Sequence, residues 1–401
     1  MRRSVPRRSA LLALLCCLAT ACASSPVPEA QRTAEPARSS AAATPTPDPE
    51  AARQAALDAQ VTATLARLDR DGQLAQLFVV GVHLDDLSAA DPLVRDTRVG
   101  GIFLRGRSTV STTELAATTA RWRSLSPGAA PWVAADQEGG RVQTLSGPGF
   151  GALPAAWEQA QLPPAQLAAV ADGMGASLAS AGVTLNLAPV ADVVPAGTEG
   201  GNAPIGALGR HYGSTAATMT PTAQVVIDGL AAHGVTATLK HFPGLGHVQE
   251  NTDNAVGVTD TVIGADHEQV AAFGRLARSP SSPFVMMSSA TYAQIDPAGQ
   301  AAFSRPVVTD LLRGQLGFGG VVISDDLGAA IAVQDLPPGE RAVRFLAAGG
   351  TLVLTVDSRV APEMLAAVRD RAAADPAFAA AVDGAVRTAL LAKARLGMLP
   401  G

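Results

Sequence analysis

The amino-acid sequence predicts an α/β fold, a (β/α)8 barrel of the TIM type that forms a single domain. Three observations predict it. Short apolar runs alternate with helical stretches, there are eight such runs, and 401 residues suffice for a barrel with extensions. Continuous apolar runs are typical of parallel strands buried on both faces. Eight strand–helix units with right-handed crossovers close most readily into a barrel, and an open doubly wound sheet is the alternative.

The expected strands are the apolar, β-branched runs 77–82, 101–104, 132–135, 184–188, 236–239, 284–287, 321–323 and 352–356. Between them, Ala- and Leu-rich segments with helical spacing include 165–180, 219–232, 307–316 and 341–348. In a barrel, the carboxyl ends of all eight strands meet on one face, where active sites are built.

The composition excludes several classes of protein. Apolar residues make up 47% of the chain and the net charge is −5, which permits a large core and argues against a disordered chain. The mild acidity and the absence of a basic stripe argue against a protein that binds nucleic acid. All three cysteines lie near the start of the chain, at positions 16, 17 and 22. The remaining chain therefore has no internal disulfide and no thiolate metal site.

The first 22 residues have the pattern of a signal segment. Four arginines precede the apolar run 10–19, which is too short to span a bilayer. Residues 19–22 can be read as an Ala-x-Ala peptidase site, or as a lipobox in which Cys22 becomes the lipidated N-terminus. The segment predicts export to the cell envelope, with membrane anchoring through Cys22 as the favoured interpretation and plain secretion as the alternative.

A linker and the barrel domain follow the signal segment. Residues 23–52 are rich in Ala, Pro, Ser and Thr and predict a semi-rigid spacer between an anchor and the domain 53–401.

Two adjacent carboxylates follow the seventh expected strand. Asp325 and Asp326 come directly after the apolar run 320–323, where a carboxylate can be held rigidly at the barrel mouth. Glycoside hydrolysis needs such a group to attack or stabilise an anomeric carbon. Capping of the next helix is the other interpretation. We expect a division of roles, with Asp325 catalytic and Asp326 structural.

Other candidate residues follow the third and fifth strands. Lys240 and His241 offer donors to sugar hydroxyls, and the loop after them carries His247 and Glu250. Zinc binding by the two histidines lacks a clear third ligand, so no metal and no cofactor is expected. Asp136 begins a double-glycine turn and offers acceptors to sugar hydroxyls, although a turn held by its own Asp–Arg pair is also open.

Taken together, these motifs resemble glycoside hydrolase family 3, in its single-domain β-N-acetylhexosaminidase branch. The resemblance covers the chain from about residue 73 to about residue 397, and the order and spacing of its motifs make it specific. The motifs are the segments 72–77, 136–142, 187–192, 205–206 with Arg210, 240–244, and 316–318 followed by 321–327.

The resemblance implies a (β/α)8 barrel and a metal-free retaining mechanism with a covalent glycosyl-enzyme. Asp325 matches the position of the family's nucleophile. The family's substrate-binding residues match Asp136, Arg210, Lys240 and His241 here. A second binding arginine of the family falls on a threonine in this chain.

The loop after the fifth strand departs from the family's pattern. The branch carries Asp-Ser-His there, with the histidine as general acid/base, whereas this chain has Asn251-Thr252-Asp253. A carboxylic acid can perform the same proton transfer if burial near Asp325 raises its pKa. Asp253 is the first candidate for the acid/base, with His247 and Glu250 as the next.

The expected function is that of an exported β-N-acetylglucosaminidase or β-N-acetylhexosaminidase that acts on a carbohydrate substrate such as cell-wall fragments. A family 3 hydrolase of neutral sugars such as glucose is one alternative. A sugar-binding lipoprotein that has lost catalysis is another, against which the retention of Asp325 argues.

Overall fold

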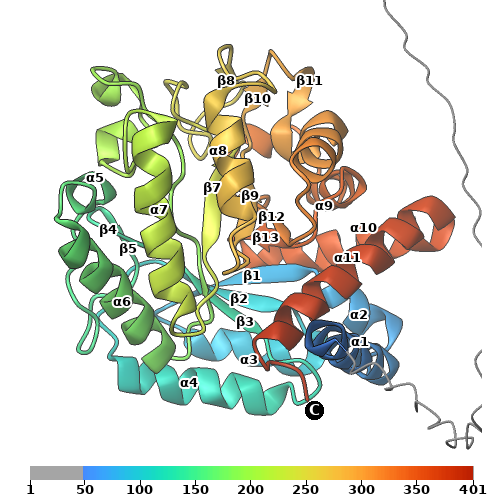
Figure 1. The fold of residues 1–401 in the computed structure, drawn as a ribbon. Coiled ribbons are helices and arrows are strands. Elements are labelled where there is room, and N and C mark those ends of the chain that lie inside the picture. Colours follow the sequence, from blue (N-terminus) through green and yellow to red (C-terminus); the bar gives the residue numbers. More distant parts are fainter. Residues whose placement is uncertain (1–47, 401) are drawn as a thin grey trace, which may run out of the picture. The chain divides into compact units, whose positions relative to one another are not determined.

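Eight parallel strands form the centre of the molecule in the computed structural model, which describes residues 48–400 (Figure 1). They are β1 (Phe78–His83), β2 (Gly101–Arg105), β3 (Trp132–Ala135), β6 (Leu185–Asn186), β7 (Thr238–Phe242), β9 (Phe284–Met287), β12 (Val322–Ser324) and β13 (Val353–Thr355). The predicted eight strands are therefore all present, each within a few residues of its expected range.

These strands close into a barrel. One sheet has the order β13-β1-β2-β3-β6 and another has the order β12-β9-β7, with every pairing parallel. Parallel bridges join the two sheets on both sides, from Leu185 to Thr236 and from Ile323 to Leu352. The (β/α)8 prediction is confirmed.

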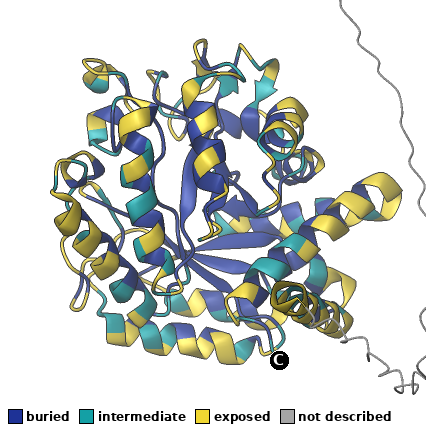
Figure 2. Cartoon of the chain, in the orientation of Figure 1, coloured by how far each residue is buried: buried dark blue, intermediate teal, exposed yellow. Residues whose placement is uncertain are grey.

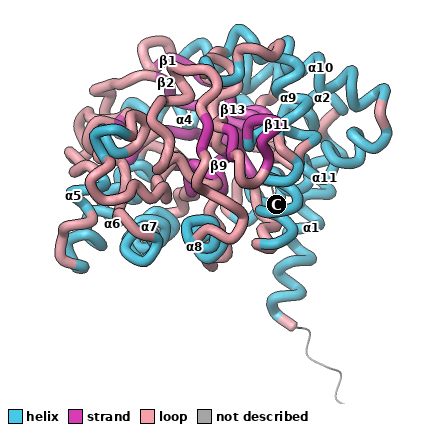
Figure 3. The backbone as a smooth tube through the Cα atoms, turned by 90° about the horizontal axis from the view of Figure 1, so that it is seen from above, coloured by secondary structure: helices cyan, strands magenta, loops and turns pink. Residues whose placement is uncertain are grey.

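An outer layer of helices surrounds the strands, as the view from above shows (Figure 3). Its members are α2 (Arg70–Ala75), α3 (Ala90–Pro92), α4 (Thr112–Leu125), α5 (Ala156–Gln159), α6 (Pro164–Ser180), α7 (Ala216–Ala231), α8 (Glu268–Ala277), the π-helical segment Pro306–Gln315, α9 (Pro338–Ala347), α10 (Ala361–Ala374) and α11 (Pro376–Arg395). Outward helix faces are exposed while the strands are buried (Figure 2). This division follows from the continuous apolar strands and the one-sided helices.

Short strands build the loops of the barrel. Strands β4 (Gln137–Gly139) and β5 (Val142–Gln143) form a hairpin directly after β3. Strands β8 (Thr259–Asp260), β10 (Thr291–Tyr292) and β11 (Asp296–Gln300) form a small sheet from the loops after β7 and β9.

The start of the described chain is helical. Helix α1 (Pro49–Arg67) begins with Asp48 as its cap, whose side chain accepts from the backbone N–H of Glu50 at 3.0 Å. The last residues of the expected linker 23–52 therefore belong to a helix. The signal segment, Cys22 and the rest of the linker lie outside the described residues. Within 48–400, no helix has the length and apolar character needed to cross a membrane.

One strand lies further along the chain than expected. The fifth strand was predicted at 236–239, with Lys240 and His241 just beyond it, but β7 runs to Phe242 and includes both. The apolar pattern missed this because charged residues do not usually occupy a buried strand. Here the carboxylates of Asp136, Glu138 and Asp192 compensate for their burial.

Candidate active site

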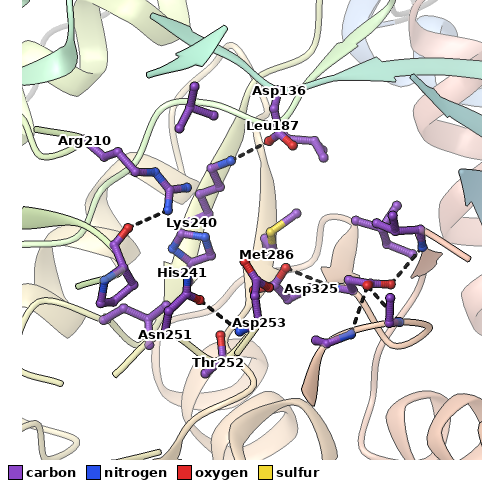
Figure 4. Close-up of a pocket in the computed structure, with 18 of the residues that line it drawn as sticks. Asp136, Leu187, Arg210, Lys240, His241, Asn251, Thr252, Asp253, Met286 and Asp325 are labelled. Carbon is purple, nitrogen blue, oxygen red and sulfur yellow. Dashed lines mark hydrogen bonds and ion pairs between the residues drawn. The ribbon is translucent and has the colours of Figure 1, made fainter. Parts of the chain in front are cut away.

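A cavity of about 420 Å³ opens at the carboxyl ends of the strands. Its polar lining includes the side chains drawn in Figure 4: Asp136, Arg210, Lys240, His241, Asn251, Thr252, Asp253 and Asp325. The structure therefore brings six of the predicted site residues together from five different loops and strands. Such convergence at the carboxyl end of a barrel is where active sites are built.

The double-glycine turn after β3 shapes one wall of this pocket. Gly139 and Gly140 have φ values of +107° and +57°, which favour glycine. A Cβ on Gly139 would also lie 2.1 Å from the carbonyl oxygen of Pro154. Glu138 in this turn does not line the pocket, while Asp136 pairs with Lys240 and not with the arginine of its own turn.

Glu138 is the centre of a buried charge network. Its two carboxylate oxygens accept from Nε and Nη2 of Arg210 at 2.9 and 2.8 Å. Nζ of Lys240 lies 2.6 Å from Oε1 of Glu138 and donates to Oδ1 of Asp136 at 2.8 Å. Arg210 also donates to the carbonyl oxygen of Pro204 at 2.8 Å. Paired, hydrogen-bonded charges of this kind hold long side chains in one orientation.

The network keeps Glu138, Arg210 and Lys240 charged. Burial alone would raise the pKa of Glu138, but the charges of Arg210 and Lys240 outweigh burial and lower that pKa to about 2. Burial would lower the pKa values of the two cations, yet the facing carboxylates raise both. The two cations that line the cavity, Lys240 and Arg210, therefore stay charged and can donate hydrogen bonds to sugar hydroxyls.

His241 is oriented by a fully buried carboxylate. Its Nδ1 lies 2.7 Å from Oδ2 of Asp192, and its backbone N–H donates to Oδ1 at 3.0 Å. The backbone N–H of Leu245 donates to the same Oδ1 at 2.9 Å. A carboxylate on Nδ1 favours the tautomer with its proton there, which leaves Nε2 as an acceptor for the substrate.

Asp325 and Asp326 differ in how their side chains are hydrogen-bonded. Both oxygens of Asp326 accept from backbone N–H groups, those of Gly328 and Val356 at 2.8 Å on Oδ1 and those of Ala329 and Ala330 at 2.9 and 3.1 Å on Oδ2. Asp325 accepts only from the N–H of Asp326, at 2.8 Å, and lines the pocket. The carboxylate of Asp326 is occupied by the backbone N–H groups of the loop, whereas the carboxylate of Asp325 is available to a substrate.

Asp253 faces the same pocket from the loop after β7. The carbonyl oxygen of Asp253 accepts from the N–H of Ile331 at 3.2 Å, and that of Thr252 accepts from Ala332 at 3.0 Å. These bonds tie the loop to the segment after Asp325. Desolvation by the surrounding protein raises the pKa of Asp253, and the charge of Asp325 raises it further, while His241 and Arg210 oppose the rise. A raised pKa is what a general acid at neutral pH requires.

The two other acid/base candidates do not reach the pocket. His247 is half-buried and packs edge-on against His267, with ring centroids 5.7 Å apart. Glu250 is exposed, and neither residue lines the cavity. The sequence placed both in the right loop, but the direction of a side chain within an irregular loop depends on tertiary contacts. Over residues 48–400, no three His, Cys, Asp or Glu side chains lie close enough to hold a metal ion.

Sequence reasoning missed the roles of Glu138 and Asp192. Both lie within motifs quoted above, yet neither lines the cavity; they act by holding Arg210, Lys240 and His241. A signal was available, since a buried strand that contains Lys and His requires buried carboxylates nearby.

Comparison with known proteins defines the class of this barrel. Residues 70–389 match the glycosyl hydrolase family 3 N-terminal domain. The chain resembles the crystal structure of a β-N-acetylhexosaminidase from Beutenbergia cavernae, with a TM-score of 0.78. The two sequences are 45% identical, and the match covers 81% of this chain and 98% of that one. The chain therefore belongs to glycoside hydrolase family 3.

Relatives that are named as beta-hexosaminidases also match the chain. It is 32% identical to the beta-hexosaminidase LpqI of Mycobacterium tuberculosis over 90% of each chain, and 35% identical to a beta-hexosaminidase of Bordetella avium over 65% of this chain and 74% of that protein. The protein is a glycosidase that hydrolyses O-glycosyl bonds.

Proposed function

We propose that the protein is an exported β-N-acetylhexosaminidase that cleaves amino-sugar glycosides, such as cell-wall fragments, with retention of configuration. The observation that carries this proposal is the pairing in one pocket of an available carboxylate, Asp325, with a second carboxyl group of raised pKa, Asp253. Retaining glycosidases use such a pair as nucleophile and acid/base.

In the first step, Asp325 attacks the anomeric carbon while protonated Asp253 gives its proton to the leaving oxygen. A covalent glycosyl-enzyme forms on Asp325, and the alcohol leaves. In the second step, Asp253 takes a proton from the attacking water, and the sugar is released from Asp325. Esterification removes the charge of Asp325, which is one of the causes that raise the pKa of Asp253. The pKa of Asp253 therefore falls at this stage, so its carboxylate form is available when a base is needed.

The charge network supplies the sugar-binding side of this proposal. Asp136 offers acceptors to adjacent hydroxyls, and the cations Lys240 and Arg210 offer donors that Glu138 holds in place. His241 presents Nε2 because Asp192 engages its other nitrogen. A polar lining of this kind distinguishes a sugar by its pattern of hydroxyls.

Export and anchoring are supported by the N-terminal sequence. An arginine-rich start, a short apolar run and Cys22 at the end of a lipobox-like segment favour a lipoprotein. An anchor would keep the enzyme beside a cell-wall substrate. Replacing Cys22 with Ser should release the protein from the membrane fraction, and a wild type that is already fully soluble after export would refute the anchor.

A substrate panel tests the proposed activity. The purified enzyme should hydrolyse an aryl N-acetyl-β-glucosaminide at least about tenfold faster than the matching aryl β-glucoside, with D325A as the background control. A preference for the glucoside would instead indicate a hydrolase of neutral sugars. Sugar binding without turnover of either substrate would indicate a binding protein that has lost catalysis.

A further inference from the structure

The opposite end of the barrel holds a second cavity, of about 630 Å³, which we term the basal cavity. It is lined by the segments that lead into β7, β9 and β12, by the end of α11 and by the start of α1. Since all eight strands are parallel, the starts of these strands lie away from the active-site mouth. A ligand in the basal cavity would therefore not compete with a sugar at the active site.

Among the described residues, three arginines line the basal cavity, and no aspartate or glutamate does. Arg278 donates to the carbonyl oxygen of Leu316 at 2.7 Å, and Arg53 lies 3.9 Å from Glu50 on its own helix. Arg395 has no ion pair with any carboxylate of residues 48–400. Within residues 48–400, Arg278 and Arg395 thus have no carboxylate partner, and the basal cavity presents positive charge to an anion.

The rest of the lining suits a phosphate group. Besides the arginines, the lining includes serines from the segment before β9 and glycines from the segment before β12, among them Ser281, Ser282 and Gly319. A Cβ on Gly319 would meet no atom within 4 Å, so packing does not require glycine there. One carboxylate, Asp228, lies beside the rim and already accepts from the hydroxyl of Ser281 at 2.8 Å. Hydroxyl groups and guanidinium forks are the donors that bind phosphate oxygens.

We propose that the basal cavity binds the phosphate-bearing headgroups of anionic phospholipids. The phosphate chemistry rests on the arginines, and the choice of a lipid rests on the proposed anchor at Cys22. Only residues 23–47 separate Cys22 from the described chain, which begins next to this cavity because Arg53 of α1 lines it. Helix α1 is held there by the bond from Arg387 of α11 to Asp58, at 3.0 Å.

This arrangement orients the enzyme. With the basal cavity against the membrane, the active-site mouth faces away from the lipid surface and toward the wall. A cationic surface beside the anchored N-terminus would add an electrostatic attraction to anionic lipids. Each arginine near an anionic surface strengthens binding by a factor of about five, and three would give on the order of 100-fold.

Vesicle binding of the mature chain without its lipid, residues 23–401, tests the proposal. It should co-sediment with vesicles that contain phosphatidylglycerol and not with pure phosphatidylcholine, and added salt should weaken the binding. The variant Arg53→Gln/Arg278→Gln/Arg395→Gln should bind at least tenfold more weakly. The control Arg95→Gln/Arg359→Gln/Arg369→Gln removes the same charge from exposed arginines outside the cavity and should bind like the wild type.

Three outcomes would overturn the proposal. They are equal binding by the basal variant and the wild type, equal losses in both variants, and binding of inorganic phosphate without binding of anionic vesicles. The last would mean that the cavity takes a free phosphate. Hydrolysis of aryl glycosides, measured in parallel, should be unchanged in the basal variant. Vesicle binding does not depend on turnover, so failure of the proposed activity would be seen separately.

Discussion

Buried cations at the two ends of the barrel differ in whether a carboxylate faces them. At the mouth, the buried cations Lys240 and Arg210 are paired with carboxylates that hold them in fixed positions. At the base, Lys393 is equally buried, yet its Nζ donates only to the side-chain oxygen of Gln76, at 2.7 Å. The paired cations stay charged, whereas burial lowers the pKa of Lys393 to about 7. A buried cation is a fixed charge only where the fold also supplies its counter-charge.

The largest expected effect comes from the pair of aspartates after β12. Asp325→Asn should lower kcat by at least about 10⁴-fold and leave stability nearly unchanged, because the side chain of Asp325 accepts one hydrogen bond within residues 48–400. Asp326→Asn should instead destabilise the fold by about 2–4 kcal/mol, because an amide nitrogen cannot accept from backbone N–H groups. Steady-state kinetics and urea unfolding of both variants separate the two roles. Near-normal turnover by Asp325→Asn would remove it as the nucleophile.

The next effect concerns proton transfer by Asp253. Asp253→Ala should lose about 10²–10³-fold on substrates with poor leaving groups and much less on activated aryl glycosides, which need little protonation. Because Asp253 must be protonated in the first step, wild-type activity should fall as the pH rises through its raised pKa. This basic limb should disappear in the variant, and added azide should restore turnover of the activated substrate. Equal losses on both substrates would point to a structural role.

Glu138→Gln should weaken substrate binding at the active-site mouth without removing a reacting group. Arg210 and Lys240 would lose their shared carboxylate, so we expect a rise in KM of about tenfold or more and a stability loss of about 3–5 kcal/mol. The folded pKa of Glu138, about 2, lies below its unfolded value. The carboxylate therefore stabilises the protein fully above pH of about 5 and loses this contribution toward pH 2. Urea unfolding of wild type and Glu138→Gln at pH 6 and pH 3 tests this. The difference between their unfolding free energies should shrink at pH 3, and a difference that stays the same would contradict the prediction.

The sequence predicted the parts of this structure that depend on local pattern. Continuous apolar runs located all eight strands, and the position of Asp325 after β12 located the candidate nucleophile. The pattern failed at β7, where Lys240 and His241 lie within the strand. Their burial depends on Glu138 and Asp192, which are distant in sequence, and hydrophobic periodicity contains no information about such pairs. The direction of His247 was missed for the same reason, since its ring packs against His267 from a separate loop.

The smallest effect tests the contrast between the two ends directly. Lys393 has a folded pKa of about 7, below the unfolded value of about 10.4, so the unfolded chain binds more protons between these pH values. Stability attributable to Lys393 should therefore rise with pH in this range. Between pH 7.5 and pH 9, the unfolding free energy of the wild type should gain about 1–2 kcal/mol relative to Lys393→Met. The matched variant at the mouth, Lys240→Met, should show no such drift, because facing carboxylates raise the pKa of Lys240 and keep it charged throughout. Urea unfolding of the three proteins at both pH values gives the comparison. If the difference in unfolding free energy between wild type and Lys393→Met does not change with pH, the ammonium group of Lys393 keeps its charge in the folded protein. The two ends of the barrel would then differ in the arrangement of their buried cations and not in the charge of these cations.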